Sequence, residues 1–172
     1  LLRKFVLEDA KDMYEYASDP EVAKYVTWNP HQTINDSLGF IQFTLDRYEK
    51  DEAGDWGIVL KENNKFIGSC GFVWIDKKNL CGHIGYTLSR KYWNMGIMSE
   101  AVKRLLEFGF NKMNLHRIEA FHKLPNEASG RVMQKVGMKY EGILRGRMFS
   151  KEQFWDVKQY ALIKEDWLSN VK

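Results

Sequence analysis

The sequence predicts an α+β (mixed α/β) fold built around one central, mostly antiparallel sheet of about seven strands. Three observations lead to this prediction. Strand-like segments and segments with helical periodicity both occur, three strand segments follow one another in mid-chain, and the last of these is joined to a further strand through a helix. Consecutive strands form an antiparallel meander, whereas two strands joined by a helix lie parallel.

Length and composition are typical of one domain, which we expect to span residues 1–172. Hydrophobic residues make up 44% of the chain and aromatic residues 14%, enough apolar surface for a core. The net charge of +3 comes from 26 basic and 23 acidic residues without a run of like charges, which argues against a nucleic-acid-binding surface. No apolar stretch has the length of a membrane span and no signal-peptide pattern is found, so we expect a cytoplasmic protein without membrane contact.

The first part of the chain reads as one strand followed by helices. The acidic segment Glu8-Asp9-Ala10 is typical of a helix start, and Pro20 ends the helix that follows it. We expect a strand at residues 1–7 and helices at 8–19, 21–25 and about 35–50.

The rest of the chain reads mainly as strands separated by polar turns. One helix has a clear apolar side along Val102, Leu105 and Leu106, and Gly137 ends the next helix. We expect strands at 56–60, 66–75, 80–88, 117–122, 140–149 and 154–163, and helices at about 98–113 and 126–136.

The two cysteines lie in neighbouring strands of the meander. A hairpin closed at residues 76–79 places Cys70 opposite a residue near Gly85, and Cys81 opposite one near Trp74. The thiols are therefore too far apart to form a disulfide. No cluster of His and Cys has the spacing of metal ligands, so we expect no metal site.

The turn before the helix at 98–113 has the features of an anion-binding site. Gly96 allows close approach of the backbone, and the first amides of a helix have no partner within the helix. The helix dipole favours an anion there, and we expect Arg90 and Lys91 to raise the local positive potential. Taken alone, one glycine before a helix is also an ordinary strand-to-helix connection, so both interpretations stay open at this point.

Short motifs occur in a fixed order along most of the chain. They are Leu2-Arg3, Glu8-Asp9-Ala10, Gly85 to Leu88, Tyr92 to Ala101, Leu115 to Ala120, Asn126 to Ser129, Lys135 to Met138, Glu141 to Arg145, Trp155-Asp156 and Asp166-Trp167. In this order they resemble the motifs of the GNAT superfamily of N-acetyltransferases, in particular the branch with the ribosomal-protein N-terminal acetyltransferases. Asn94 stands where this family usually has glycine, and Met98 where it usually has alanine or glycine.

The resemblance implies a GNAT-like sheet flanked by helices on both faces and acetyl-CoA as the cosubstrate, with no metal. It also implies direct attack of an amine on the thioester, without an acetyl-enzyme intermediate. Amides from Met95 to Ser99 would hold the pyrophosphate, and backbone groups near Tyr86 and Leu88 would align the pantetheine arm. The residues expected to contact the cofactor are Tyr86, Leu88, Trp93, Asn94, Met95, Gly96, Ile97, Met98, Ser99, Asn126 and Ser129.

Three residues are candidates for the catalytic chemistry. The resemblance places Ser129 near the thiol as a general acid, although helix position alone explains Asn126 as a cap and Ser129 as a surface hydroxyl. His83 is a candidate base because strand alternation places it on the sheet face opposite Ile84, the side of a substrate cleft. A hydrogen-bonded structural histidine is an equal alternative for this residue. Glu119 is a further candidate, for which an ion-paired structural role fits as well. Weaker candidates are Tyr92 as an acid and Glu141 and Glu152 as bases.

The resulting functional hypothesis is acetyl transfer from acetyl-CoA to a primary amine. The N-terminal α-amine of a protein stands ahead of a small-molecule amine, and a CoA-binding sensor without turnover is an alternative of another class. We expect Trp28, His31 and the N-terminal helices to form the acceptor side of the cleft, and the chain to be able to form a homodimer.

Overall fold

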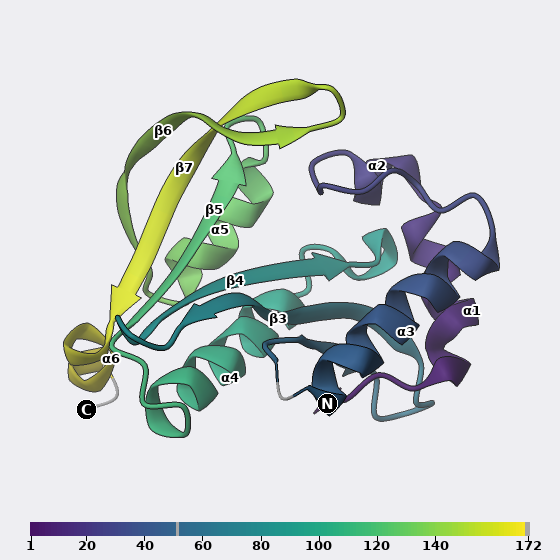
Figure 1. Cartoon of the computed structure of the whole chain (residues 1–172), viewed down its shortest axis with the longest axis horizontal. Helices are drawn as coiled ribbons and strands as arrows, with labels where there is room; N and C mark the ends of the chain where they lie inside the picture. Colours follow the sequence, from purple (N-terminus) through teal and green to yellow (C-terminus); the bar gives the residue numbers. More distant parts are fainter. Residues whose placement is uncertain (51, 171–172) are drawn as a thin grey trace.

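The computed structural model describes residues 1–50 and 52–170 and contains one seven-stranded sheet with helices on both faces, as predicted (Figure 1). The strand order is β1-β2-β3-β4-β5-β7-β6, and among these neighbours only β4 and β5 run parallel. The antiparallel meander and the single parallel crossover expected from the sequence are therefore confirmed.

The N-terminal part contains one very short strand and three helices. These are β1 (Leu2–Arg3), α1 (Ala10–Ala17), α2 (Pro20–Ala23) and α3 (Ile34–Glu49). The prediction of a strand through residues 1–7 was wrong for all but two residues. Arg3 donates to both carboxylate oxygens of Asp9 at 2.8 and 2.6 Å, and Asp9 also accepts from the Val6 amide at 2.9 Å. These bonds turn the chain away from the sheet immediately after β1.

The remaining elements follow the predicted order. They are β2 (Asp55–Val59), β3 (Phe66–Asp76), β4 (Cys81–Leu88), α4 (Ile97–Asn111), β5 (Arg117–Lys123), α5 (Glu127–Lys135), β6 (Lys139–Ser150), β7 (Gln153–Ile163) and α6 (Lys164–Asn170). The helix α6 was not predicted. It packs Trp167 against Phe110 of α4, with ring centroids 5.7 Å apart. None of the described helices is long and apolar enough to cross a membrane.

Two hydrophobic clusters lie on opposite faces of the sheet. Side chains alternate between the faces along each strand, so Ile67 of β3 joins the cluster with α4 and α5, while the preceding Phe66 joins the cluster with α1 and α3. In Figure 1, α4 lies below the sheet and α1 and α3 lie in front of it. Burial of this many large side chains, at roughly 25 cal/mol per Å², is the main force that holds both helical layers to the sheet.

The cysteines are free and lie far from each other in register. Cys70 pairs with Tyr86 and Cys81 pairs with Asp76, each slightly displaced from the partner expected from the sequence. The turn occupies residues 77–80 instead of 76–79, which displaces the partner of Cys81 by two residues, and a β-bulge between Phe72 and Trp74 reduces the displacement to one residue at Cys70. Burial raises the pKa of the Cys70 thiol to about 12, so this thiol is not a nucleophile at neutral pH.

Candidate active site

The candidate site begins where β4 and β5 separate. Their parallel pairing covers only Cys81–His83 and Arg117–Glu119, although both strands continue beyond it. The Ser89 amide donates to the Ile67 carbonyl of β3 at 2.8 Å. Along a strand, successive residues direct their backbone N–H and C=O groups to opposite neighbouring strands. The peptide groups of Tyr86 and Leu88 therefore face the gap beside β5. The Leu88 carbonyl accepts from the Trp93 indole at 2.8 Å, which ties the following loop to the end of β4.

A cavity of 530 Å³ lies at this gap. With one exception, it is lined by the residues expected to contact the cofactor. These lining residues are Tyr86, Leu88, Trp93, Asn94, Gly96, Ile97, Met98, Ser99, Asn126 and Ser129. The exception is Met95, which is 65% exposed and does not line the cavity.

The loop before α4 contains two left-handed residues. Asn94 has a φ of 63° and Gly96 has a φ of 79°. Asn is among the few non-glycine residues that adopt this conformation readily, which explains how Asn94 occupies a position usually held by glycine in the resembling family. The first helical bond of α4 runs from the Glu100 amide to the Gly96 carbonyl, so the Ile97, Met98 and Ser99 amides point out of the helix end toward the cavity.

Three basic residues that the sequence analysis did not single out also line the first cavity: Lys24, Arg131 and Lys135. Arg131 and Lys135 are four residues apart on α5, a spacing that places both on one side of the helix. The spacing of these two residues on one helix could be predicted from the sequence. Their position beside the cavity could not, because it depends on where β4 and β5 separate.

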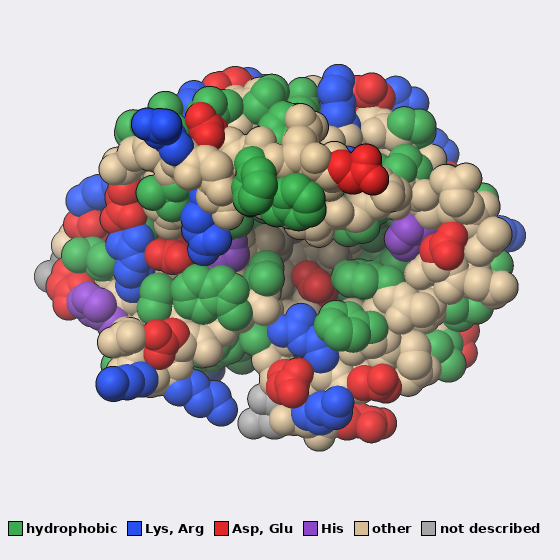
Figure 2. All heavy atoms as spheres, turned by 45° about the horizontal axis from the view of Figure 1, so that its top comes forward, with side chains coloured by type: hydrophobic (Ala, Val, Ile, Leu, Met, Phe, Trp, Pro, Cys, Tyr) green, Lys and Arg blue, Asp and Glu red, His purple; other side chains and the backbone are tan. Residues whose placement is uncertain are grey.

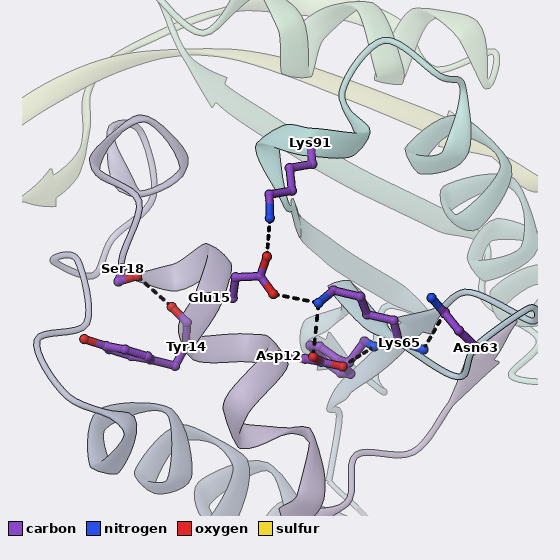
Figure 3. Close-up of polar contacts among 8 residues, drawn as sticks. Asp12, Tyr14, Glu15, Ser18, Asn63, Lys65 and Lys91 are labelled. Atoms are coloured by element: carbon purple, nitrogen blue, oxygen red, sulfur yellow. Dashed lines mark hydrogen bonds and ion pairs between the residues drawn. The ribbon is translucent and has the colours of Figure 1, made fainter.

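Arg90 and Lys91 do not contribute to the cavity lining, so the expectation that they raise its potential was wrong. Arg90 forms an ion pair with Asp19 at 2.8 Å, and Lys91 pairs with Glu15 of α1. Lys65 completes the network by contacting Glu15 at 2.6 Å and Asp12 at 3.3 Å (Figure 3). The acidic partners offset both positive charges, and the network joins α1 to the segment after β4.

Replacing Glu15 with Gln is expected to lower the free energy of unfolding at neutral pH by about 1 kcal/mol or less, because the side chain is largely exposed to solvent. Its hydrogen bonds to Lys65 and then Lys91 lower the pKa of Glu15 to about 2. Since the folded-state pKa is lowered, this stabilisation is present above the ordinary glutamate pKa and is lost as the pH falls toward 2. Urea unfolding of Glu15→Gln and of the exposed control Glu8→Gln checks this; equal losses in both variants would contradict it.

Ser129 lies in the first turn of α5, next to the gap. Its amide is 3.4 Å from the Asn126 side-chain oxygen, so Asn126 caps the helix as its position suggested. The Tyr86 hydroxyl lies 2.9 Å from both the Ser129 hydroxyl and the Ser129 carbonyl. Burial raises the pKa of Tyr86 above its ordinary value, so both hydroxyls are protonated at neutral pH. The sequence analysis missed the Tyr86 side chain because its partner is 43 positions away.

A second cavity, of 770 Å³, meets the first at Tyr86, Asn126 and Ser129, which line both. Trp28 and His31 line this second cavity, together with side chains from α1, α3 and the sheet. The face drawn in Figure 2 is hollowed, with hydrophobic side chains around the opening and acidic atoms inside it. The two cavities thus provide two compartments that share one hydroxyl-bearing junction.

His83 lines the second cavity on the sheet face opposite α4. Its ring stacks on Trp74 at a centroid distance of 5.5 Å and contacts Phe121 at 4.6 Å. Burial lowers the pKa of His83, and the nearby Glu119 carboxylate partly opposes this shift. The imidazole is therefore neutral at neutral pH and able to accept a proton.

Glu119 lies behind His83 and lines neither cavity. One carboxylate oxygen is 3.8 Å from Nδ1 of His83, and the other accepts from Arg117 at 3.1 Å. Arg117 in turn contacts Glu141 at 2.8 and 2.5 Å. Among the weaker candidates, Glu141 is therefore ion-paired, and Glu152 lies outside both cavities. In the described part of the chain, no three His, Cys, Asp or Glu side chains are grouped to hold a metal ion.

Comparison with known proteins identifies the family. The family model described as acetyltransferase (GNAT) domain matches residues 1–139. The chain is 37% identical over 166 residues to the uncharacterized N-acetyltransferase p20 of Bacillus licheniformis, covering 96% of this chain and 93% of that protein. It is 34% identical over 167 residues to the uncharacterized N-acetyltransferase YnaD of Bacillus subtilis, covering 97% and 95%.

A solved structure agrees with these relatives. The acetyltransferase (GNAT family) from Bacillus anthracis superposes with a TM-score of 0.85 at 31% identity, over 96% of this chain and 95% of that one. The divergence of β4 and β5, the free amides at the start of α4 and the sequence relatives all lead to one conclusion. The chain belongs to the GNAT acetyltransferase family and is an acetyl-CoA-dependent N-acetyltransferase.

Proposed function

We propose that this enzyme transfers the acetyl group of acetyl-CoA to a primary amine by direct attack at the junction of the two cavities. The observation that carries this proposal is the hydroxyl pair of Tyr86 and Ser129, which lies where the cofactor-side and acceptor-side cavities meet. In the described part of the chain, neither cysteine lines either of these two cavities. This supports direct transfer without an acetyl-thiol intermediate on the enzyme.

In this proposal the first cavity holds acetyl-CoA, which supplies the acetyl group as a thioester. The Ile97, Met98 and Ser99 amides bind the pyrophosphate, because helix N-termini combine free donors with a favourable dipole. The peptide groups of Tyr86 and Leu88 align the pantetheine arm along the open side of β4. Arg131 and Lys135 offset the remaining phosphate charge at the rim. A TM-score of 0.84 to microcin C7 self-immunity acetyltransferase, solved with acetyl-CoA and AMP at 22% identity, supports the fold of this site.

The chemical step forms a C–N bond and breaks the C–S bond. The neutral amine attacks the thioester carbonyl carbon, and the departing thiolate needs a proton. The Ser129 hydroxyl donates that proton and regains one from solvent, and the Tyr86 hydroxyl orients Ser129. His83 accepts the proton that the amine loses, directly or through water, and releases it to solvent. Glu119 acts through His83 as a positioning residue, since its carboxylate faces Nδ1 from behind the ring.

Two acceptor classes fit this site. A protein N-terminal α-amine is supported by the [Ribosomal protein uS5]-alanine N-acetyltransferase of Escherichia coli, 23% identical over 121 residues. A small amine is supported by the second cavity, which the aromatic residues of the N-terminal helices border. The homodimer and the cytoplasmic location remain predictions.

Release of CoA thiol from acetyl-CoA across a panel of peptides and small amines tests the proposed function. We expect release only when an amine is present, with matching formation of acetylated amine. Ser129→Ala should lower kcat by about tenfold, because the Tyr86 hydroxyl remains as a partial proton donor, and should change CoA affinity by less than about twofold. Loss of folding in Ser129→Ala would assign the Ser129 hydroxyl to a structural role instead. CoA binding without release from any amine would favour a sensor.

A further inference from the structure

Asp55 is a carboxylate without a partner in the second cavity. It begins β2 and lines the cavity wall. Within residues 1–50 and 52–170, its side chain accepts no hydrogen bond and forms no ion pair, and only its backbone carbonyl accepts, from Tyr48. Burial raises the pKa of Asp55 to about 6, although the nearby Arg47 opposes this shift. An ionised carboxylate in such a place is costly unless a cation compensates it.

The register of the sheet places Asp55 in line with the reaction junction. Asp55 pairs with Gly71 of β3, and Gly71 pairs with Gly85 of β4, the residue before Tyr86. Directly paired residues share one face of a sheet, and His83, two residues from Gly85, shares that face as well. A Cβ on Gly71 would meet the backbone of Gly54 and Asp55, so β2 lies close against β3 here, while Gly85 lines the same cavity as Asp55. Two strand spacings separate Asp55 from Gly85, a distance of about 10 Å across the sheet.

The groups around Asp55 leave its negative charge unmatched. Arg47 is the nearest cation, but its guanidinium is 3.9 Å from Glu52 and donates to the Val73 carbonyl at 3.2 Å. Lys123 also lines the cavity, yet it is held by Ser150 at 2.7 Å and by the face of the Trp155 ring. The remaining neighbours are neutral. They are Tyr16, Tyr48 and Cys70.

Tyr16 adds a second free polar group to the same wall. Its hydroxyl has no hydrogen-bond partner in the described part of the chain, and burial together with the Asp55 charge raises its pKa, so it stays protonated. Apolar and aromatic side chains line the same cavity, among them Met13, Trp28, Phe40 and Phe43. A carboxylate and a phenol among aromatic rings are the chemistry that binds an ammonium or guanidinium group on an aliphatic chain.

We propose that Asp55 binds a second positive charge on the acceptor, so that the preferred substrate is an amine with a further cationic group several carbon atoms from the reacting nitrogen. This inference rests on the proposed function. The acceptor lies in the second cavity, with one nitrogen at the junction near His83 and Ser129. Its second cation lies beside Asp55.

Cadaverine and hexylamine test the subsite as a matched pair, because a methyl group in hexylamine replaces the second ammonium of cadaverine. For the wild-type enzyme we expect kcat/KM to favour cadaverine by about tenfold or more, the usual effect of a hydrogen bond to a charged group. Asp55→Asn should remove this preference by raising KM for cadaverine with little change in kcat. KM for hexylamine should change by less than about twofold. The control Asp46→Asn, on the exposed side of α3, should behave as wild type.

Equal KM changes for both amines in Asp55→Asn, or no preference in wild type, would overturn the subsite. A tripeptide with Lys as its second residue, compared with one with Ala there, identifies whether the cation belongs to a peptide: a preference for Lys that Asp55→Asn removes supports that source. If no amine is acetylated, the proposed function fails. The subsite is still measured by calorimetry of cadaverine binding to the CoA complex, and equal affinity in wild type and Asp55→Asn would overturn it.

Thermal unfolding provides a readout that a structural aspartate would not give. The folded-state pKa of Asp55 is raised from 3.8 to about 6, so the ionised carboxylate costs stability above that range, and the cost disappears as the pH falls below the unfolded-state value. Asp55→Asn should therefore raise Tm at neutral pH and have no such effect in acid. A lower Tm at neutral pH would show that Asp55 stabilises the fold and would overturn its assignment as a binding residue.

Discussion

Gly96→Asp is expected to weaken CoA binding by roughly a hundredfold, because it places a negative charge beside the pyrophosphate at the N-terminus of α4. Gly96→Asn is the matched control. Asn and Asp have the same shape and both adopt left-handed backbone, and a Cβ at this position meets no atom within 4 Å. The neutral variant adds the same bulk without the charge, so it should lose far less affinity than Gly96→Asp.

Calorimetric titration with CoA at two salt concentrations measures this difference. The loss in Gly96→Asp should shrink as salt increases, because screening weakens repulsion between charges near the surface. Wild-type affinity in both variants would remove the pyrophosphate from the end of α4. Equal large losses in both would show that the left-handed φ of 79° needs glycine itself.

His83→Gln is expected to lower kcat by about a hundredfold, the effect of losing a general base. Burial lowers the pKa of His83, so the neutral imidazole persists below the ordinary histidine pKa, and wild-type kcat should fall only when the pH drops below that value. The variant should lose this acidic limb of the pH profile. His116→Gln, at an exposed histidine outside both cavities, is the control. An unchanged profile in His83→Gln would assign the proton transfer to water or to another group.

Much of the fold was predictable because its signals are local. Polar turns separate β2, β3 and β4, and Gly137 follows α5, so element types and order could be predicted. The first strand was predicted too long because the Arg3–Asp9 ion pair, which turns the chain, depends on side-chain geometry rather than on periodicity. The helix α6 was missed because its seven residues directly continue β7 without a turn signal.

The lining of the first cavity was largely predictable, and that of the second much less so. Most of the residues expected to contact the cofactor belong to the continuous segment around Gly96, whose motif and helix start are visible in the sequence. The roles of Arg90 and Lys91 were predicted wrongly, since their acidic partners come from a distant helix. Asp55 could not be singled out, because its importance depends on the sheet register and on a cavity formed by helices before it in the chain.

The central claim is that the two cavities meet at a site where an amine attacks acetyl-CoA. The most direct measurement is the rate of CoA-thiol release with and without a primary amine, with the acetylated amine quantified by mass spectrometry. We expect CoA-thiol release that depends on the amine and equals the amount of acetylated product. Both Ser129→Ala and His83→Gln should reduce it. Release that is independent of amine, or tight CoA binding with no acetylated product from any peptide or diamine, would contradict it.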